Sequence, residues 1–296
     1  MSTESRLERF RRADRWPTEE SLAAMLEHQL NALAAVRGGL AAMGRAVRAA
    51  AERLGDDGRL VYVGAGASGR LAVQDGVELW PTFGWPNERL LYLVAGGDRA
   101  LVESREGAED DGESAAALIE AHRIGPADVV IGVAASGTTA FTRGALVAAR
   151  ARGALTVGMA NNPDAPLLRD AEHGVPLLTG PEFLAGSTRM AAGTAQKIAL
   201  NLFSTQLMIE LGRVYDGLMV HVVATNAKLV RRSRQIVQAI AGCDEEEAAR
   251  AYETAGRSIP LAVLLLDGLA PDEARARLHE ARGDLRRARP TPSRNR

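Results

Sequence analysis

The chain has 296 residues, 36 basic against 37 acidic side chains, a formal net charge of -1 and one cysteine. A near-zero charge balance argues against a general nucleic-acid or membrane-surface protein, because both partners favour a positive excess. One cysteine excludes an internal disulfide framework, and no apolar run approaches the roughly 18 residues that a membrane span needs. We therefore expect a soluble, cytoplasmic protein without nucleic-acid or membrane partners.

Apolar residues at helical spacing mark the first part of the chain. They run through residues 19–55 and predict two helices that break near Gly38 and Gly39. Short apolar runs typical of buried strands follow at 59–63, 90–95, 128–133 and 154–159, with a weaker one at 173–178. Helical stretches, notably 112–122 and 140–152, separate most of them. This alternation predicts an α/β fold in which helices cover both faces of a parallel sheet.

The rest of the chain is predicted to be largely helical. Helical sequence runs from Ser187 to about Gly242 with a break near residues 215–217. A small bundle should follow, because Asp244 and Pro271 are typical helix starts. We divide the chain into an N-terminal helical segment (1–50), an α/β domain (51–242), a small helical bundle (243–288) and a tail (289–296).

A glycine-rich loop follows the first predicted strand. Its residues, Gly64-Ala65-Gly66-Ala67-Ser68-Gly69, match the pattern GxGxxG, which usually indicates a dinucleotide-binding fold. That fold also needs an acidic residue about 20 residues further on, at the end of the second strand. The next acid at a strand end is Asp98, which comes much too late. A nicotinamide-dependent dehydrogenase is therefore the least favoured interpretation.

Two more loops place small hydroxyl residues at a predicted helix start. Ser136-Gly137-Thr138-Thr139 follows the third strand, and Gly186-Ser187-Thr188-Arg189 opens the long helix that contains Lys197. Free backbone N–H groups and the positive end of a helix dipole make such a position an anion site. Simple helix capping would explain any one of these loops. Three of them on one fold indicate a bound phosphate, and hence a sugar phosphate.

Two of the acidic residues are candidates for proton transfer. Glu78 lies in an apolar stretch beside Leu79 and Trp80, and burial against either would keep it protonated as a general acid. Glu109 lies in an acidic turn shortly after the second strand. A surface carboxylate at a helix end and a solvated acidic turn would explain the same residues, so both interpretations stay open.

Several segments together resemble one known family. They are GRLVYVGAGASGRLAVQDGVELWPTFG, REGAEDD, DVVIGVAASGTTAF, GPEFLAGSTRMAAGTAQKIALNLFSTQLMIELGRVYDGLMV and VVATNAKL, in order from residue 58 to about 240. They are similar to the N-acetylmuramic acid 6-phosphate etherases, which belong with the glucokinase regulatory proteins to the sugar isomerase (SIS) domain superfamily. The resemblance implies a flavodoxin-like parallel sheet within 51–242 and a homodimer with its site near the subunit interface, without metal or cofactor.

The resemblance also implies a reaction and a set of site residues. Members of this family cleave the lactyl ether of N-acetylmuramic acid 6-phosphate, by elimination and then hydration, to N-acetylglucosamine 6-phosphate and D-lactate. Glu78 would be the acid and Glu109 the base. The substrate-binding residues would be Gly66, Ala67, Ser68 and Gly69, then Ser136, Gly137, Thr138 and Thr139, then Ser187 and Thr188, with Lys197.

Some residues depart from the family pattern. Val77, Leu79 and Trp80 surround Glu78 where the family has a small residue and a Cys-Pro-Pro run, and Thr138 stands where etherases often have arginine. These changes leave two alternatives to the etherase. One is a non-catalytic sugar-phosphate sensor of the glucokinase regulatory type, and the other is a phosphosugar isomerase.

Overall fold

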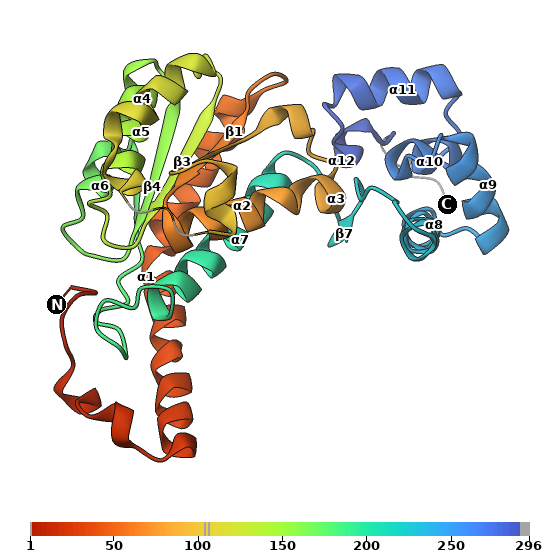
Figure 1. Cartoon of the computed structure of the whole chain (residues 1–296). Coiled ribbons are helices and arrows are strands. Elements are labelled where there is room, and N and C mark those ends of the chain that lie inside the picture. Colours follow the sequence, from red (N-terminus) through yellow and green to blue (C-terminus); the bar gives the residue numbers. More distant parts are fainter. Residues whose placement is uncertain (1, 104, 106, 291–296) are drawn as a thin grey trace. The chain divides into compact units, whose positions relative to one another are not determined.

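The computed structural model describes residues 2–103, 105 and 107–290 (Figure 1). The chain forms two compact units. The sheet unit contains the residues up to Gly76 and those from Glu88 to Ser204, and the helical unit contains Val77–Asn87 and the residues from Thr205 onward. The units do not coincide with the predicted boundaries at residues 50 and 242. Of the predicted tail, residues 291–296 lie outside the described residues.

Parallel strands form the sheet of the first unit. They are β1 Leu60–Gly64, β2 Leu90–Val94, β3 Val129–Ala134, β4 Leu155–Ala160 and β5 His173–Pro176. Their order is β2-β1-β3-β4-β5, the flavodoxin-like arrangement, so the predicted strands and fold class are confirmed. Gly64 at the end of β1 pairs with Val94 of β2 and Val133 of β3. The loops after these three strands therefore start from one edge, at the topological switch point.

Helices cover both faces of the sheet, as Figure 1 shows. They are α1 Thr18–Leu54, α2 Gly66–Val77, α4 Gly112–Ala121, α5 Ala140–Ala151, α6 Pro166–Asp170 and α7 Ala191–Glu210. Val61 and Val63 pack into the core that the sheet forms with α4, α5 and α6. Tyr62 points to the opposite face, where its hydroxyl donates to Asp75 of α2 at 2.9 Å. The helices predicted at 112–122 and 140–152 are confirmed.

Helix α1 is continuous over 37 residues, so the predicted break near Gly38 and Gly39 is wrong. A Cβ atom at Gly39 would lie 2.7 Å from the carbonyl oxygen of Pro176. This glycine therefore allows α1 to approach β5, where a larger residue would collide with the strand. Glycine inside a helix costs about 1 kcal/mol relative to alanine, and here the close packing offsets that cost.

The helical unit consists of short helices and a hairpin. The helices are α3 Leu79–Phe83, α8 Ala227–Ala241, α9 Glu245–Thr254, α10 Ile259–Leu266, α11 Pro271–Glu280 and α12 Leu285–Ala288, and the hairpin strands are β6 Val214–Tyr215 and β7 Leu218–Met219. The hairpin makes the break near 215–217 wider than predicted. The predicted helix starts are confirmed, because Asp244 caps α9 in a capping box with Glu247 and α11 begins at Pro271.

The segment Val77–Asn87 belongs to the helical unit through distant contacts. Arg213 donates from Nη1 to the carbonyl oxygens of Phe83 and Gly84, both at 2.9 Å. Arg213 and Phe83 lie 130 residues apart in the chain. Local periodicity carries no sign of such a contact, which explains why the predicted domain boundaries do not separate this segment from the sheet.

Candidate active site

The first glycine-rich loop forms a tight turn between β1 and α2. Gly66 has a positive φ of 52°, and a Cβ atom at Gly64 would lie 2.8 Å from the Cα atom of Gly69. Glycine at these positions therefore lets α2 start directly against the end of β1. The first N–H groups of a helix have no partner within the helix and lie at the positive end of its dipole. The start of α2 is thus suited to an anion.

A cavity of about 400 Å³ lies beside this loop. Its lining residues are Ala65, Gly66, Ala67 and Arg70, then Ala95, Ala100, Glu103 and Arg105, and then Gly107, Ala108 and Glu109. The structure therefore brings Glu109 to the same cavity as the start of α2. The cavity combines helix N–H groups, two guanidinium groups and carboxylates, which suits an anionic sugar.

Hydrogen bonds connect the two walls of this cavity. Arg70 of α2 donates from Nε to the carbonyl oxygen of Ala100 at 3.0 Å and from Nη2 to that of Glu103 at 3.4 Å. Glu109 lies on the 3-10 helix Ala108–Asp110, and its side chain is exposed. An exposed carboxylate at the cavity wall can accept a proton from a bound ligand. Glu106, in the same acidic motif, lies outside the described residues.

The second loop is shaped by one glycine and by hydroxyl contacts. Gly137 has a φ of 71°, and a Cβ atom there would lie 2.3 Å from the Cβ atom of Ala165, so only glycine fits. Thr138 donates from Oγ1 to Oγ of Ser136 at 2.9 Å. Thr139 precedes α5, yet its side chain makes no capping bond. Helix capping therefore does not account for Thr139, and its role in substrate binding stays a prediction.

The third loop differs from the other two. Helix α7 begins at Ala191, after the predicted start at Ser187. Its first N–H groups are occupied, because the fully buried carboxylate of Glu182 accepts from Ala191 and Ala192, both at 2.9 Å. The argument from the helix dipole therefore does not hold for this loop. Substrate binding by Ser187 and Thr188 stays a prediction.

Glu78 is exposed, so the predicted burial against Leu79 or Trp80 is wrong. It is the residue between α2 and α3, and α3 turns Leu79 rather than Glu78 into the interior. Trp80 keeps 36% of its surface exposed. Glu78 belongs to the helical unit, and its place in the reaction stays a prediction.

Lys197 lies on the exposed side of α7, close to a buried acid that the sequence did not single out. This acid is Asp75, which accepts from Tyr62 Oη at 2.9 Å, Asn201 Nδ2 at 2.6 Å and Ser204 Oγ at 3.1 Å. Burial raises the pKa of Asp75, and the three hydrogen bonds and the charge of Lys197 oppose this. The sequence gives one sign of a role for Asp75: it is an acidic residue on the side of α2 that faces the interior.

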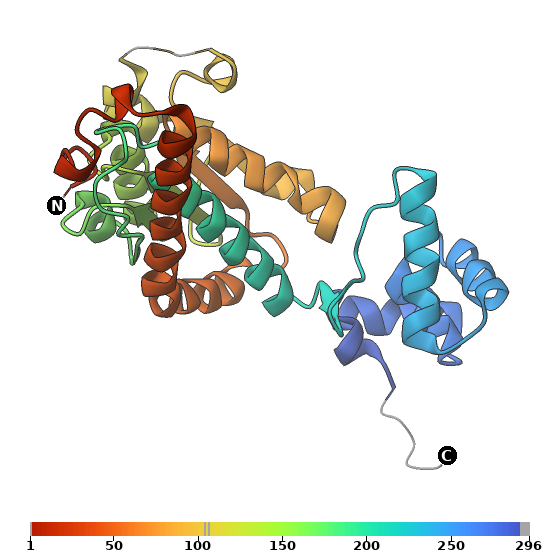
Figure 2. The ribbon, with the colours of Figure 1, turned by 90° about the horizontal axis from the view of Figure 1, so that it is seen from below.

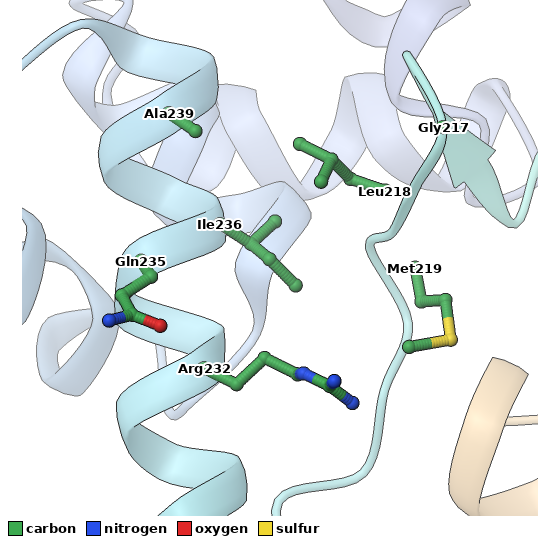
Figure 3. Close-up of a pocket in the computed structure, with 7 residues that line it drawn as sticks. All are labelled: Gly217, Leu218, Met219, Arg232, Gln235, Ile236 and Ala239. Carbon is green, nitrogen blue, oxygen red and sulfur yellow. The ribbon is translucent and has the colours of Figure 1, made fainter.

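A second cavity, of about 320 Å³, lies in the helical unit (Figure 3). Ile236 of α8 and Leu218 of the hairpin point toward each other there, and Arg232 extends toward Met219. The remaining lining residues are Gly217, Gln235 and Ala239. This cavity offers no carboxylate among its lining residues, so it is less suited to proton transfer than the first.

The described part of the chain contains no group of three or more His, Cys, Asp or Glu residues arranged to bind a metal ion. Within the same residues, no helix combines the length and the apolar character needed to cross a bilayer.

Fold and site define a protein of the SIS class. The model of the SIS domain matches residues 110–206, and that of the glucokinase regulatory protein N-terminal SIS domain matches residues 42–150. A solved structure from Bacteroides fragilis, described as a candidate phosphosugar isomerase involved in capsule formation, has a TM-score of 0.50 and 18% identity and covers 68% of this chain and 95% of that chain. At this identity the match supports the fold alone.

Sequence relatives identify the particular family. The chain is 51% identical over 266 residues to N-acetylmuramic acid 6-phosphate etherase of Deinococcus radiodurans, covering 90% of this chain and 87% of the relative. It is 45% identical over 289 residues to the protein of the same name from Rubrobacter xylanophilus, covering 97% of this chain and 95% of the relative. The chain belongs to the N-acetylmuramic acid 6-phosphate etherase family.

Proposed function

We propose that this protein is a carbon–oxygen lyase that converts N-acetylmuramic acid 6-phosphate to N-acetylglucosamine 6-phosphate and D-lactate. The observation that carries the proposal is the cavity in which Glu109 and the open start of α2 meet. An anion site and a proton acceptor in one cavity are what a phosphosugar lyase needs. The membership of the chain in the etherase family supports the same reaction.

The reaction begins with the open-chain aldehyde of the sugar, in which the C2 proton lies α to a carbonyl group and is acidic enough to remove. Glu109 takes this proton while the bond between C3 and the lactyl oxygen breaks, and Glu78 protonates the departing oxygen. Elimination leaves a double bond between C2 and C3 and releases lactate. Water then adds across it, with the two carboxyl groups exchanging their proton roles.

Phosphate binding places the substrate for these steps. The first N–H groups of α2 bind the phosphate oxygens, and Arg70 and Arg105 in the cavity wall add positive charge. The hydroxyl groups of Ser136 and Thr138 bind the sugar. In this arrangement the protein needs no metal or cofactor to bind the substrate or to transfer its protons.

The direct test is D-lactate release from N-acetylmuramic acid 6-phosphate by the purified protein. Glu109→Gln and Glu78→Gln should each lower kcat by about 10²–10⁴, the usual contribution of a general acid or base. Asp110→Asn is the matched control, because Asp110 is a neighbouring exposed acid of the same turn. Equal activity of Glu109→Gln and Asp110→Asn would overturn the assignment of the base. Phosphosugar binding without lactate release would favour a sensor instead.

We further propose that the protein is a homodimer that uses residues 22–40 of α1 as a contact between subunits. Its leucines with 48–71% of their surface exposed are Leu22, Leu26, Leu30, Leu33 and Leu40. Their spacing puts them on one face of the helix. Such a stripe can pair with its own copy about a two-fold axis. The cytoplasmic location expected for this enzyme stays a prediction.

Subunit association is tested by size-exclusion chromatography with light scattering, which measures the molar mass of the protein in solution. Leu26→Glu combined with Leu33→Glu should convert a dimer to a monomer, because buried charges oppose association. Val147→Glu is the control, since Val147 of α5 is 52% exposed but lies outside the stripe. A dimer that survives the double substitution, or a monomeric wild type, would contradict this proposal.

A further inference from the structure

The N-terminal segment, residues 2–16, has no part in the mechanism above. It nevertheless packs on the stretch that leads into the third loop, as Figure 2 shows. The ring of Phe10 lies 4.5 Å from that of Phe183 and 5.4 Å from that of His28 of α1. Phe10 and Phe183 are both buried. These aromatic contacts therefore hold Phe10 between α1 and the residues that lead into the third loop.

Thr3, at the start of the segment, is held by hydrogen bonds. It is fully buried, with 0% of its surface exposed, although chain termini are usually poorly ordered unless other contacts hold them. Its N–H donates to Oδ1 of Asn162 at 3.0 Å, and its carbonyl oxygen accepts from the N–H of Gly186 at 3.2 Å. Gly186 is the first residue of the third loop.

Asn162 extends this contact to the second loop. Its Nδ2 donates to the carbonyl oxygen of Ser136 at 3.3 Å and to Oγ1 of Thr3 at 3.3 Å. One buried residue near the chain start is thus hydrogen-bonded to the third loop directly and to the second loop through a single side chain. These contacts join Ser136 and Gly186, which no strand or helix connects.

The third loop is also shaped around the residue that follows Thr3. Gly186 has a φ of 76°, and a Cβ atom there would lie 2.9 Å from Oε2 of Glu4. The positive φ favours glycine, and a Cβ atom there would make the flexible carboxylate of Glu4 move. The N-terminal segment and the third loop are therefore in contact at this residue.

We propose that the N-terminal segment is part of the substrate site, with Thr3 as a positioning residue that sets the spacing between the second and third loops. Both loops then contact one sugar phosphate at the same time. This inference deepens the proposed function and rests on it for the identity of the substrate. The chemical class of ligand is an anionic phosphosugar that spans both loops.

The test is a kinetic comparison of variants in the full chain. Asn162→Ala removes the acceptor of the Thr3 N–H and the donor to Ser136. Thr3→Pro removes the Thr3 N–H itself. Each should raise KM for N-acetylmuramic acid 6-phosphate about tenfold, as expected for a lost interaction of about 1.4 kcal/mol, with kcat nearly unchanged. The double variant should resemble each single one, because each substitution alone already interrupts the series of hydrogen bonds from Ser136 through Asn162 and Thr3 to Gly186.

Arg11→Gln is the matched control. It breaks the exposed ion pair between Arg11 and Glu8 (3.5 Å) within the same segment and should leave KM unchanged. Thermal melting of all variants separates positioning from loss of fold. Unchanged KM in Asn162→Ala and Thr3→Pro, or multiplied effects in the double variant, would overturn the proposal.

A second measurement distinguishes this proposal from the proposed function. If the wild type releases no lactate, the etherase assignment fails by itself. Binding of N-acetylglucosamine 6-phosphate and of inorganic phosphate, measured by calorimetry, then decides the role of Thr3. Weaker binding of either probe by both variants supports it. Equal binding by wild type and variants, or no binding by the wild type, overturns it.

Discussion

The two units bury polar groups in different ways. In the sheet unit these groups join separate elements: Glu182 caps α7, Asn161 donates to the carbonyl oxygen of Leu177 at 2.9 Å, and Asp75 connects α2 to α7. In the helical unit, His221 donates from Nε2 to the carbonyl oxygen of Gly283 at 2.9 Å. The charges of Arg213 and Asp284 act on this ring.

The buried polar groups of the sheet unit position other elements, whereas His221 of the helical unit contributes to packing. Burying a polar group costs free energy unless hydrogen bonds replace those to water. In the sheet unit, hydrogen bonds offset that cost for Glu182, Asn161 and Asp75, and each of these groups holds two elements in a fixed relation. His221 instead fills space in the helical unit as a neutral side chain. We therefore expect substitution of these buried groups of the sheet unit to affect both stability and substrate binding, and substitution of His221 to affect stability alone.

The largest effect is expected for Glu182. Glu182→Ala should lower the free energy of unfolding by about 4 kcal/mol, because two charge-assisted hydrogen bonds, each worth about 1.5–3 kcal/mol, are lost. It should also raise KM, since the third loop begins just before α7. Urea unfolding and steady-state kinetics measure the two effects. Glu120→Ala on the exposed side of α4 is the control and should change stability by less than about 0.5 kcal/mol. Unchanged stability of Glu182→Ala would contradict the role of this carboxylate in holding the start of α7.

Local pattern predicted most of the fold. Strands and helices follow from apolar periodicity, and the first loop and Glu109 could be placed together because both follow strands that end at one edge. The same reasoning failed where the deciding partner is distant in sequence. Gly39 looked like a helix break because Pro176, which explains it, lies on another element.

The candidate site shows the same limit. Both α2 and α7 follow a glycine-containing loop, but a cavity lies beside the start of α2, whereas Glu182 occupies the start of α7. The carboxylate that occupies the start of α7 belongs to Glu182, which lies in one of the family segments but was not predicted to have a role. Thr3 and Asn162 are 159 residues apart, so their contact could not be derived from spacing. Predicting such pairs requires the packed structure.

The next effect concerns acid stability of the helical unit. Burial, together with the charge of Arg213, lowers the pKa of His221 to about 4, whereas an unfolded histidine has a pKa of about 6.5. Between these values the unfolded state binds more protons, so stability falls as the pH falls through this window. The difference amounts to about 3 kcal/mol once the pH is below both values.

Urea unfolding between pH 7 and pH 4 tests this expectation. A Trp16→Phe background leaves Trp80 and Trp85, both in the helical unit, as fluorescent reporters. His221→Gln should flatten the pH dependence, because its amide can still donate to Gly283 but does not titrate. His279→Gln, at an exposed position of α11, should keep the slope of the wild type. Parallel curves for the wild type and His221→Gln would show that His221 is not the acid-sensitive group.

The smallest effect on stability is expected for Asp75, and its pH dependence has the opposite sign to that of His221. Burial raises the pKa of Asp75, so the folded state holds its proton more tightly than the unfolded state, and stability is lost as the pH rises through the folded pKa. Asp75→Asn retains one acceptor oxygen and should change stability at neutral pH by about 1 kcal/mol or less. Relative to wild type, the variant should gain stability as the pH rises, whereas His221→Gln should gain it as the pH falls. Hydrogen exchange of β1 amides reports on the sheet unit specifically, and a shared sign for the two variants would mean that burial does not govern both groups.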